Sequence, residues 1–229
     1  IINDGKWDTT CARVGCMPSK VLISAANRMH DINSANLVGL SVNSTIDTSS
    51  VMRHVRQLRD RFTNATMKDV NSWNKEHKIT GKASFINSNT IQVNQQIYQA
   101  KNFILAVGSI PNINQEWKDE LGELLITSNE VFELEKLPKR IAVLGSGVIA
   151  IEIAQAMQRL GVETTVFARS RKVGSLSSPT LQKLAQEIIN QEIDIKYEIL
   201  PDQLKKLGQH VAIQFTENGK PKEIQVDYV

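Results

Sequence analysis

Residues 140–150 read Arg-Ile-Ala-Val-Leu-Gly-Ser-Gly-Val-Ile-Ala, an apolar run that leads directly into a glycine-rich turn. Apolar residues at helical spacing continue to Leu160, and a second strand-like run covers Glu163 to Phe167. Strand, glycine turn, helix and strand in this order are typical of a βαβ unit in a doubly wound α/β fold. The stretch therefore predicts a Rossmann-like nucleotide-binding unit.

The glycine turn has the residue types that a bound dinucleotide requires. Gly145 permits a tight turn, Gly147 lets the backbone approach a pyrophosphate, and the small Ala150 allows close packing of the helix. The helix N-terminus attracts phosphate through its unpaired N–H groups. A glycine turn that binds nothing is the alternative. The predicted binding residues are Gly145, Ser146, Gly147, Val148, Ile149 and Ala150.

Three cations follow the second strand of this unit, in the sequence Ala168-Arg169-Ser170-Arg171-Lys172. NAD-binding proteins usually carry an acid here that binds the ribose hydroxyls, whereas an Arg accommodates the extra phosphate of NADP. Arg169 and Arg171 therefore favour NADP over NAD. A basic exposed turn without a ligand is the alternative.

The only two cysteines, Cys11 and Cys16, lie five positions apart near the start of the chain. On a regular helix their Cα atoms would be about 8 Å apart, beyond the limit of roughly 7 Å for a disulfide. If they pair, the backbone between them is irregular, and Gly15 gives it the freedom to bend. Pro18 marks the start of a helix, so Cys16 should lie at the positive end of the helix dipole, where a thiolate is favoured.

The residues around the cysteine pair suit thiol chemistry better than metal binding. Lys20 adds a positive charge one turn into the helix, and thiols of low pKa are suited to dithiol exchange. A closed metal site uses four ligands, and no second Cys or His pair lies nearby, so we expect no metal. Two unpaired buried thiols are the alternative.

The remaining pattern predicts two units, over residues 1–112 and 139–229, joined by a linker over residues 113–138. Helices are expected from Pro18 to Asp31, from a cap at Asp47 or Thr48 onward, and from Pro179 to about Gln191. Strands are expected at Ala83–Phe85, Ile91–Val93, Ile97, Phe103–Val107, Ile193–Ile195, Val211–Phe215 and Glu223–Val226.

Composition excludes several classes of partner. The chain has 229 residues, of which 41% are hydrophobic and 22% charged, and a formal net charge of +3 without a long basic block. We therefore expect no nucleic-acid binding. No apolar run approaches the roughly 20 residues needed to cross a bilayer, and the first residues do not resemble a signal peptide. The expected location is the cytoplasm.

The spacing Cys-x4-Cys-x-Pro-Ser-Lys after Thr-Thr resembles the redox-active segment of class I pyridine nucleotide-disulfide oxidoreductases, which include dihydrolipoamide dehydrogenase, glutathione reductase and mercuric reductase. The resemblance covers essentially the whole chain and implies an α/β fold of two Rossmann-like FAD/NAD(P)-binding units, both incomplete. It implies that Cys16 faces the flavin as the charge-transfer thiolate and that Cys11 exchanges with the substrate disulfide. Ser19 favours dihydrolipoamide dehydrogenase, since glutathione reductases tend to carry Lys there.

The same resemblance assigns further site residues. Glu152 would reach back to Lys20 beside the flavin, and a carboxylate partner is reasonable because burying a cation alone is costly; an ordinary exposed Glu is the alternative. The FAD side would include Thr10, Lys20, Ala83 in the turn Gly81-Lys82-Ala83 near the adenine, and Val107, Gly108 and Ser109.

Three departures from the family pattern put FAD affinity in doubt. Val107 stands where the family carries Thr, Asn3 where it carries a ribose-binding Glu, and Asp8 where Gly is usual. We also expect the sequence to be a fragment. The family's N-terminal FAD fingerprint, its C-terminal dimerisation domain and the acid/base His–Glu pair would lie outside it.

The resemblance implies a flavin-dependent oxidoreductase that passes electrons between NAD(P)(H), FAD and a dithiol/disulfide through Cys11 and Cys16. The expected cofactors are FAD and NAD or NADP, the expected substrate is lipoamide-like, and the parent protein would be a homodimer. The alternatives are an inactive dinucleotide-binding fragment and an NADPH-dependent enzyme similar to glutathione or mercuric reductase.

Overall fold

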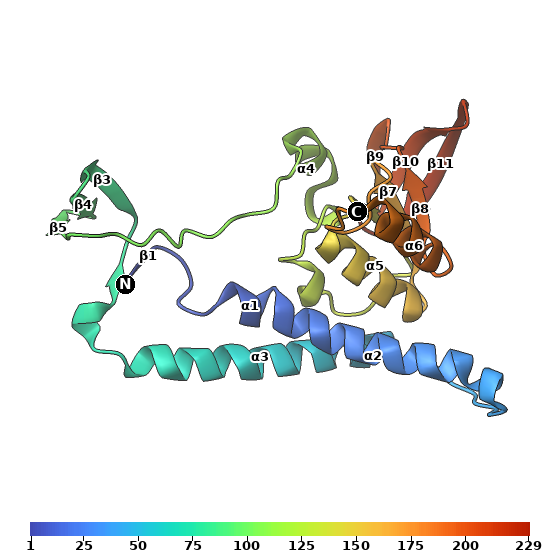
Figure 1. Cartoon of the computed structure of the whole chain (residues 1–229), viewed down its shortest axis with the longest axis horizontal. Helices are drawn as coiled ribbons and strands as arrows, with labels where there is room; N and C mark the ends of the chain where they lie inside the picture. Colours follow the sequence, from blue (N-terminus) through green and yellow to red (C-terminus); the bar gives the residue numbers. More distant parts are fainter.

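The computed structural model describes residues 1–229 and has an elongated arrangement of three parts (Figure 1). A helical hairpin runs along one side, an α/β body lies over one end of it, and a small sheet lies towards the other end. An extended stretch of chain, green in Figure 1, crosses from the small sheet to the α/β body.

The hairpin consists of α2 (Cys16–Ser34) and α3 (Thr48–Ser72), preceded by the short α1 (Thr10–Arg13). Asp47 caps α3, because its carboxylate accepts a hydrogen bond of 2.9 Å from the backbone N–H of Ser50, as its place before the apolar pattern predicts. α2 begins two residues before and ends three residues after the predicted range Pro18–Asp31, and it is continued by a 3-10 turn, η1 (Ala35–Val38). α3 ends at Ser72, where the apolar spacing predicts its end.

The α/β body contains the predicted βαβ unit. Its parallel sheet has the order β6-β7-β8, and its antiparallel sheet has the order β11-β10-β9. The elements are β6 (Arg140–Leu144), α5 (Val148–Arg159), β7 (Glu163–Ala168), α6 (Pro179–Ile189), β8 (Asp194–Tyr197), β9 (Gln203–Leu207), β10 (His210–Glu217) and β11 (Lys220–Val226). The sequence pattern predicts all of these but β9.

The small sheet is antiparallel and follows the order β3-β4-β5. A two-residue parallel pair, β1 with β2, joins the start of the chain to the segment before this sheet. The elements are β1 (Ile2–Asn3), η2 (Lys75–His77), β2 (Ile79–Thr80), β3 (Ala83–Asn87), β4 (Thr90–Val93) and β5 (Gln96–Gln99). The predicted linker contains α4 (Gln115–Leu121), η3 (Gly122–Leu124) and η4 (Val131–Glu133).

The strand expected at Phe103–Val107 is wrong. These residues have no regular secondary structure and make no backbone–backbone hydrogen bond. Ile104 is 95% exposed and Val107 is 88% exposed. An apolar run forms a strand only where a neighbouring strand pairs with its N–H and C=O groups, and no strand pairs with this run.

One hydrophobic cluster joins the hairpin to the α/β body. It has 13 buried residues and draws on α2, α3, the η4 region and α5, with Leu22, Met52, Phe132 and Met157 among its fully buried side chains. Burying each such side chain contributes about 1.5–3 kcal/mol relative to leaving it in water. The cluster therefore fixes α2, which begins at Cys16, against α5, which carries Glu152.

A polar network strengthens the contact between α2 and α5. Arg159 of α5 binds Glu192 through Nε at 2.5 Å and Nη2 at 2.8 Å, and its Nη1 donates to Asn27 of α2 at 2.6 Å. The hydrogen bond from Arg159 lowers the pKa of the Glu192 carboxyl, although its partial burial acts in the opposite direction. None of the helices has the length and apolar character needed to cross a bilayer.

Candidate redox and nucleotide-binding site

The backbone between the two cysteines is irregular, as their spacing predicts. The Oγ1 of Thr9 accepts a hydrogen bond of 3.1 Å from the N–H of Ala12 and so caps α1. That helix ends at Arg13, and α2 begins at Cys16 with Gly15 as its N-cap. Cys16 therefore occupies the first position of a 19-residue helix, where unpaired N–H groups and the helix dipole favour negative charge.

Gly15 lies in the bend that the spacing of the cysteines predicts, and it also leaves space for a close approach of the backbone. Its angles, φ −119° and ψ −122°, lie outside the helical and extended regions. A Cβ at this position would lie 3.1 Å from the carbonyl oxygen of Thr10 and 3.2 Å from the Cα of Cys11. Because both neighbours are backbone atoms, only glycine lets α1 approach the start of α2 this closely.

The two thiols are free and exposed. The neighbouring Cys16 side chain raises the pKa of the Cys11 thiol, whereas the backbone N–H groups of Cys16 and Met17 act in the opposite direction. The two side chains therefore lie near enough for one to affect the other. The alternative of two separate buried thiols does not describe them.

Lys20 and Glu152, separated by 132 positions in the chain, form an ion pair with 3.0 Å between Nζ and Oε1. The side chains are 62% and 38% exposed, so the pair is open to solvent. The charge of Lys20 is thus matched by a carboxylate from α5 instead of being available to a thiolate alone. The structure brings these two residues together as expected, and their catalytic role stays a prediction.

The glycine turn leaves open space above the start of α5. Gly145 has φ +117°, in the region that favours glycine, and a Cβ added at Gly145 or Gly147 would meet no atom within 4 Å. A cavity of about 630 Å³ borders the turn and Leu144 at the end of β6. Exposed backbone N–H groups beside such a space fit the pyrophosphate of a dinucleotide. The cavity is lined in part by Gly145, Gly147, Val148, Ile149 and Ala150.

The loop after β7 is held against this turn. The hydroxyl of Ser146 donates to the carbonyl of Lys172 at 2.5 Å, and the backbone carbonyl of Ser146 accepts from the N–H of Gly174 at 2.7 Å. Arg171 forms an ion pair with Glu198 at 2.9 Å, whereas Arg169 and Lys172 have no acidic partner. The sequence analysis missed Glu198, for which the only signal was an acid directly after the third parallel strand.

The residues expected around FAD are not gathered in one place. Thr10 lies beside the cysteines in α1, whereas Ala83 begins β3 in the small sheet, which lies apart from α1 at one end of the molecule (Figure 1). Val107, Gly108 and Ser109 belong to the exposed extended stretch, where Gly108 has φ +69°. Of the expected flavin contacts, only Thr10 and Lys20 therefore lie in or directly after the cysteine loop.

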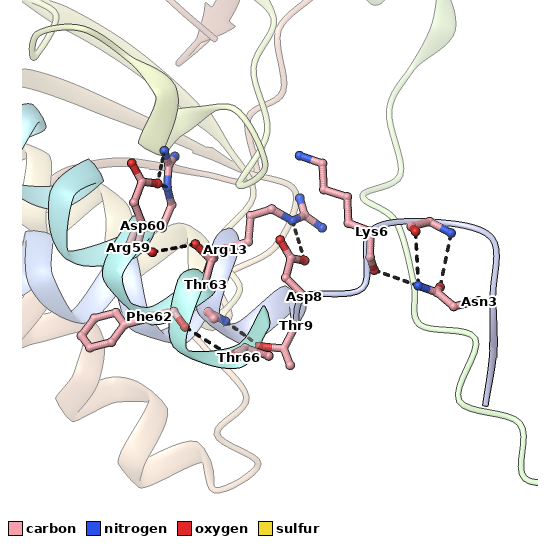
Figure 2. Close-up of polar contacts among 12 residues, drawn as sticks. Asn3, Lys6, Asp8, Thr9, Arg13, Arg59, Asp60, Phe62, Thr63 and Thr66 are labelled. Carbon is pink, nitrogen blue, oxygen red and sulfur yellow. Dashed lines mark hydrogen bonds and ion pairs between the residues drawn. The ribbon is translucent and has the colours of Figure 1, made fainter. Parts of the chain in front are cut away.

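The two polar departures near the start of the chain have local partners (Figure 2). The Asn3 amide donates to the carbonyls of Gly5 at 3.3 Å and Lys6 at 2.9 Å, which closes the loop that follows β1. Asp8 accepts from Arg13 Nε at 3.0 Å and is only 11% exposed. Asn3 shapes this loop, and Asp8 ties it to α1.

The chain is similar to known proteins along its full length. It is 29% identical to a mercuric reductase of Lysinibacillus sphaericus over 99% of this chain and 42% of that protein. It is 28% identical to a dihydrolipoyl dehydrogenase of Geobacillus stearothermophilus over 100% of this chain and 49% of that protein. The chain thus spans less than half the length of these two relatives.

Its fold matches that of a solved flavoprotein. The Cu(II) complex of the HOCl-induced flavoprotein disulfide reductase RclA from Escherichia coli superposes with a TM-score of 0.73 at 16% identity, over 99% of this chain and 48% of that one. The family model described as pyridine nucleotide-disulphide oxidoreductase matches residues 2–229. Because this model matches nearly the whole chain, the chain belongs to the pyridine nucleotide-disulphide oxidoreductase family.

Proposed function

We propose that this chain is the electron-transferring part of a flavin-dependent disulfide oxidoreductase that uses Cys11 and Cys16 as its redox pair. The observation that carries the proposal is that Cys11 of α1 lies beside Cys16 at the start of α2, across the close approach of the two helices at Gly15. Helix α2 packs against α5, at whose start the dinucleotide turn lies. A dithiol and a nucleotide-binding turn are thus parts of one packed assembly.

The chemistry at the cysteines is a two-electron exchange. The pair gives up two electrons and two protons when the S–S bond forms, and the reverse step consumes the same number. Attack on a substrate disulfide requires a thiolate. We assign the attack to Cys11, whose pKa is raised by the neighbouring Cys16 side chain. Cys11 therefore keeps its proton in the resting dithiol, and it becomes a nucleophile when a base removes that proton.

The exposed Cys16 thiol and the Lys20–Glu152 ion pair offer a donor set that fits a flavin ring: a sulfur, a cation and its counter-charge, all open to solvent. Lys20, Glu152 and Thr10 would hold the ring, whereas the other expected contacts, Ala83, Val107, Gly108 and Ser109, lie apart from them in this structure. Bound there, the flavin would carry electrons between the nucleotide and the dithiol. Glu152 keeps the Lys20 ammonium directed to this place.

We infer that the nucleotide is NADP(H). Arg169 and Lys172 are exposed cations without an acidic partner, and Ser146 holds their loop beside the glycine turn. A free guanidinium at the end of β7 suits an extra phosphate. The expected substrate is a lipoamide-like disulfide, in a cytoplasmic homodimer. Mercuric ion is the second candidate substrate, because three mercuric reductases match nearly the whole chain at 27–29% identity.

The test uses the full-length protein, purified and examined for flavin absorbance before its turnover is measured with lipoamide, glutathione disulfide and Hg²⁺. Cys16→Ser and Cys11→Ser should each lower disulfide turnover by at least about a hundredfold, since each removes one sulfur of the exchanging pair. Ser24→Ala, on an exposed part of α2, is the matched control. A colourless protein that binds nucleotide without turnover would instead support the inactive dinucleotide-binding alternative.

A further inference from the structure

A carboxylate from the neighbouring strand enters the basic loop after β7. The ends of β7 and β8 lie side by side, with Ala168 paired to Tyr197, and the N–H of Ile199 donates to the carbonyl of Ala168 at 3.2 Å. Glu198 lies between these two contacts. Its position is therefore set by the sheet, at the strand end where dinucleotide folds bind the ribose.

The backbone of Glu198 has an unusual conformation. Its φ is +59°, in the left-handed region that glycine, asparagine and aspartate tolerate best. Non-glycine residues in this region tend to lie at functional sites, where the surrounding structure holds them. A long acidic side chain in this conformation is directed towards Arg171, with 2.9 Å between Oε2 and Nε.

Arg171 is fixed on its other side by α6. Gln186 donates its side-chain amide to the carbonyl of Arg171. Gln182 binds both the N–H and the carbonyl of Val173, at 2.9 and 3.1 Å. The backbone of the loop is thus held by α6 and by Ser146 of the glycine turn, which places Arg171 beside Glu198, although the two side chains are 72% and 59% exposed.

The two nicotinamide nucleotides differ at this place by one phosphate. A dianionic phosphate is repelled by a carboxylate and competes with it for the same guanidinium. The ribose hydroxyls of NADH, in contrast, can donate hydrogen bonds to a carboxylate. The chain carries no acid directly after the second parallel strand, β7. Glu198, directly after the third strand, β8, would supply that carboxylate instead.

We propose that Glu198 is a specificity-determining residue that weakens NADPH binding and supports NADH binding, so that the site accepts both nucleotides. This proposal rests on the proposed function, in which NADP(H) binds at the basic loop, where the sequence assigns the extra phosphate to Arg169 and Arg171. Glu198 restrains the preference that these two cations would otherwise impose.

The test measures the dissociation constants of NADPH and NADH, by their fluorescence, for the full-length protein and its Glu198→Gln variant at low ionic strength. Removing the negative charge should tighten NADPH binding about fivefold, the upper end for an exposed ion pair, and weaken NADH binding about twofold. Glu187→Gln, which removes an equal charge from the exposed face of α6, is the control and should change neither constant. An unchanged ratio of the two constants, or weaker NADPH binding, overturns the proposal.

Two further variants separate this proposal from the one on which it rests. If Arg169→Gln combined with Arg171→Gln binds NADPH as tightly as the unmodified protein, the proposed NADP site is wrong, whatever Glu198→Gln does. In an Arg171→Gln background, Glu198→Gln should tighten NADPH binding by less than half of its original effect. If the full effect persists there, Glu198 does not act through Arg171, and the proposal fails while the NADP site stands.

Discussion

The proposed nucleotide side and the proposed flavin side of this chain carry equally recognisable motifs, but only the residues of the nucleotide side lie together in the structure. On the nucleotide side, β6, β7 and β8 pair in sequence order, and α5 packs below them, so the glycine turn and the basic loop are held together. On the flavin side, Val107 to Ser109 lie in an exposed stretch without backbone partners. A motif thus becomes a site only where neighbouring elements fix its backbone.

The largest expected effect contrasts a residue of the joining cluster with one of the exposed stretch. Phe132→Ala removes a side chain that is 1% exposed and should lower the free energy of unfolding by about 3–5 kcal/mol. Ile104→Ala, at a residue 95% exposed, should change it by less than about 0.5 kcal/mol. Urea unfolding measures both, and equal effects would break the comparison.

The next effect concerns the close approach of the two helices that carry the cysteines. Gly15→Ala places a Cβ 3.1 Å from a backbone oxygen and should cost about 1–3 kcal/mol of stability. It should also slow disulfide formation between Cys11 and Cys16, as followed by thiol titration during oxidation. Gly5→Ala is the control, because its Cβ would meet only Asn3 Oδ1 at 3.8 Å. Unchanged oxidation kinetics would show that the approach is not needed.

A smaller effect depends on pH and tests the polar link between α2 and α5. The pKa of Glu192 is lower in the folded protein because Arg159 donates to it. The stability from this pair is therefore complete above the unfolded pKa of about 4.3 and is lost as the pH falls through the lower folded pKa. Glu192→Gln should remove on the order of 1 kcal/mol at pH 7 and flatten the acid limb of the unfolding curve. An acid limb of the same steepness would contradict the assignment.

The smallest expected change in stability lies at the proposed flavin contact. Lys20→Met breaks an ion pair whose members are 62% and 38% exposed. The free energy of unfolding, measured by thermal unfolding, should therefore change by no more than about 1 kcal/mol. Glu152→Gln should behave alike. A loss of several kcal/mol in either variant would mean that this pair, and not the hydrophobic cluster, holds α2 against α5.

The features that could be predicted from the sequence are local ones. The strand, glycine turn and helix at 140–160, the cap at Asp47 and the irregular backbone between the cysteines all follow from residues within a few positions of each other. The contact between Lys20 and Glu152 spans 132 positions and was expected only because of the family resemblance. No spacing rule links residues so far apart.

The wrong and the missing predictions concern features that depend on contacts between distant parts of the chain. The apolar run Phe103–Val107 has strand composition, but a strand also needs a neighbour, which composition does not reveal. β9 was missed because Gln203-Leu-Lys-Lys-Leu207 lacks strict alternation and is defined by its pairing with β10. Glu198 was missed because it meets Arg171 only through the register of β7 and β8.

The hydrophobic cluster between hairpin and α/β body has a consequence for how the chain would respond to proteolysis. A protease would cut within residues 101–113, where no backbone–backbone hydrogen bond protects the chain. The two products would nevertheless stay together, because Leu22 and Met52 come from the first and Phe132 and Met157 from the second. A nicked sample would give two bands on a denaturing gel and a single peak in gel filtration.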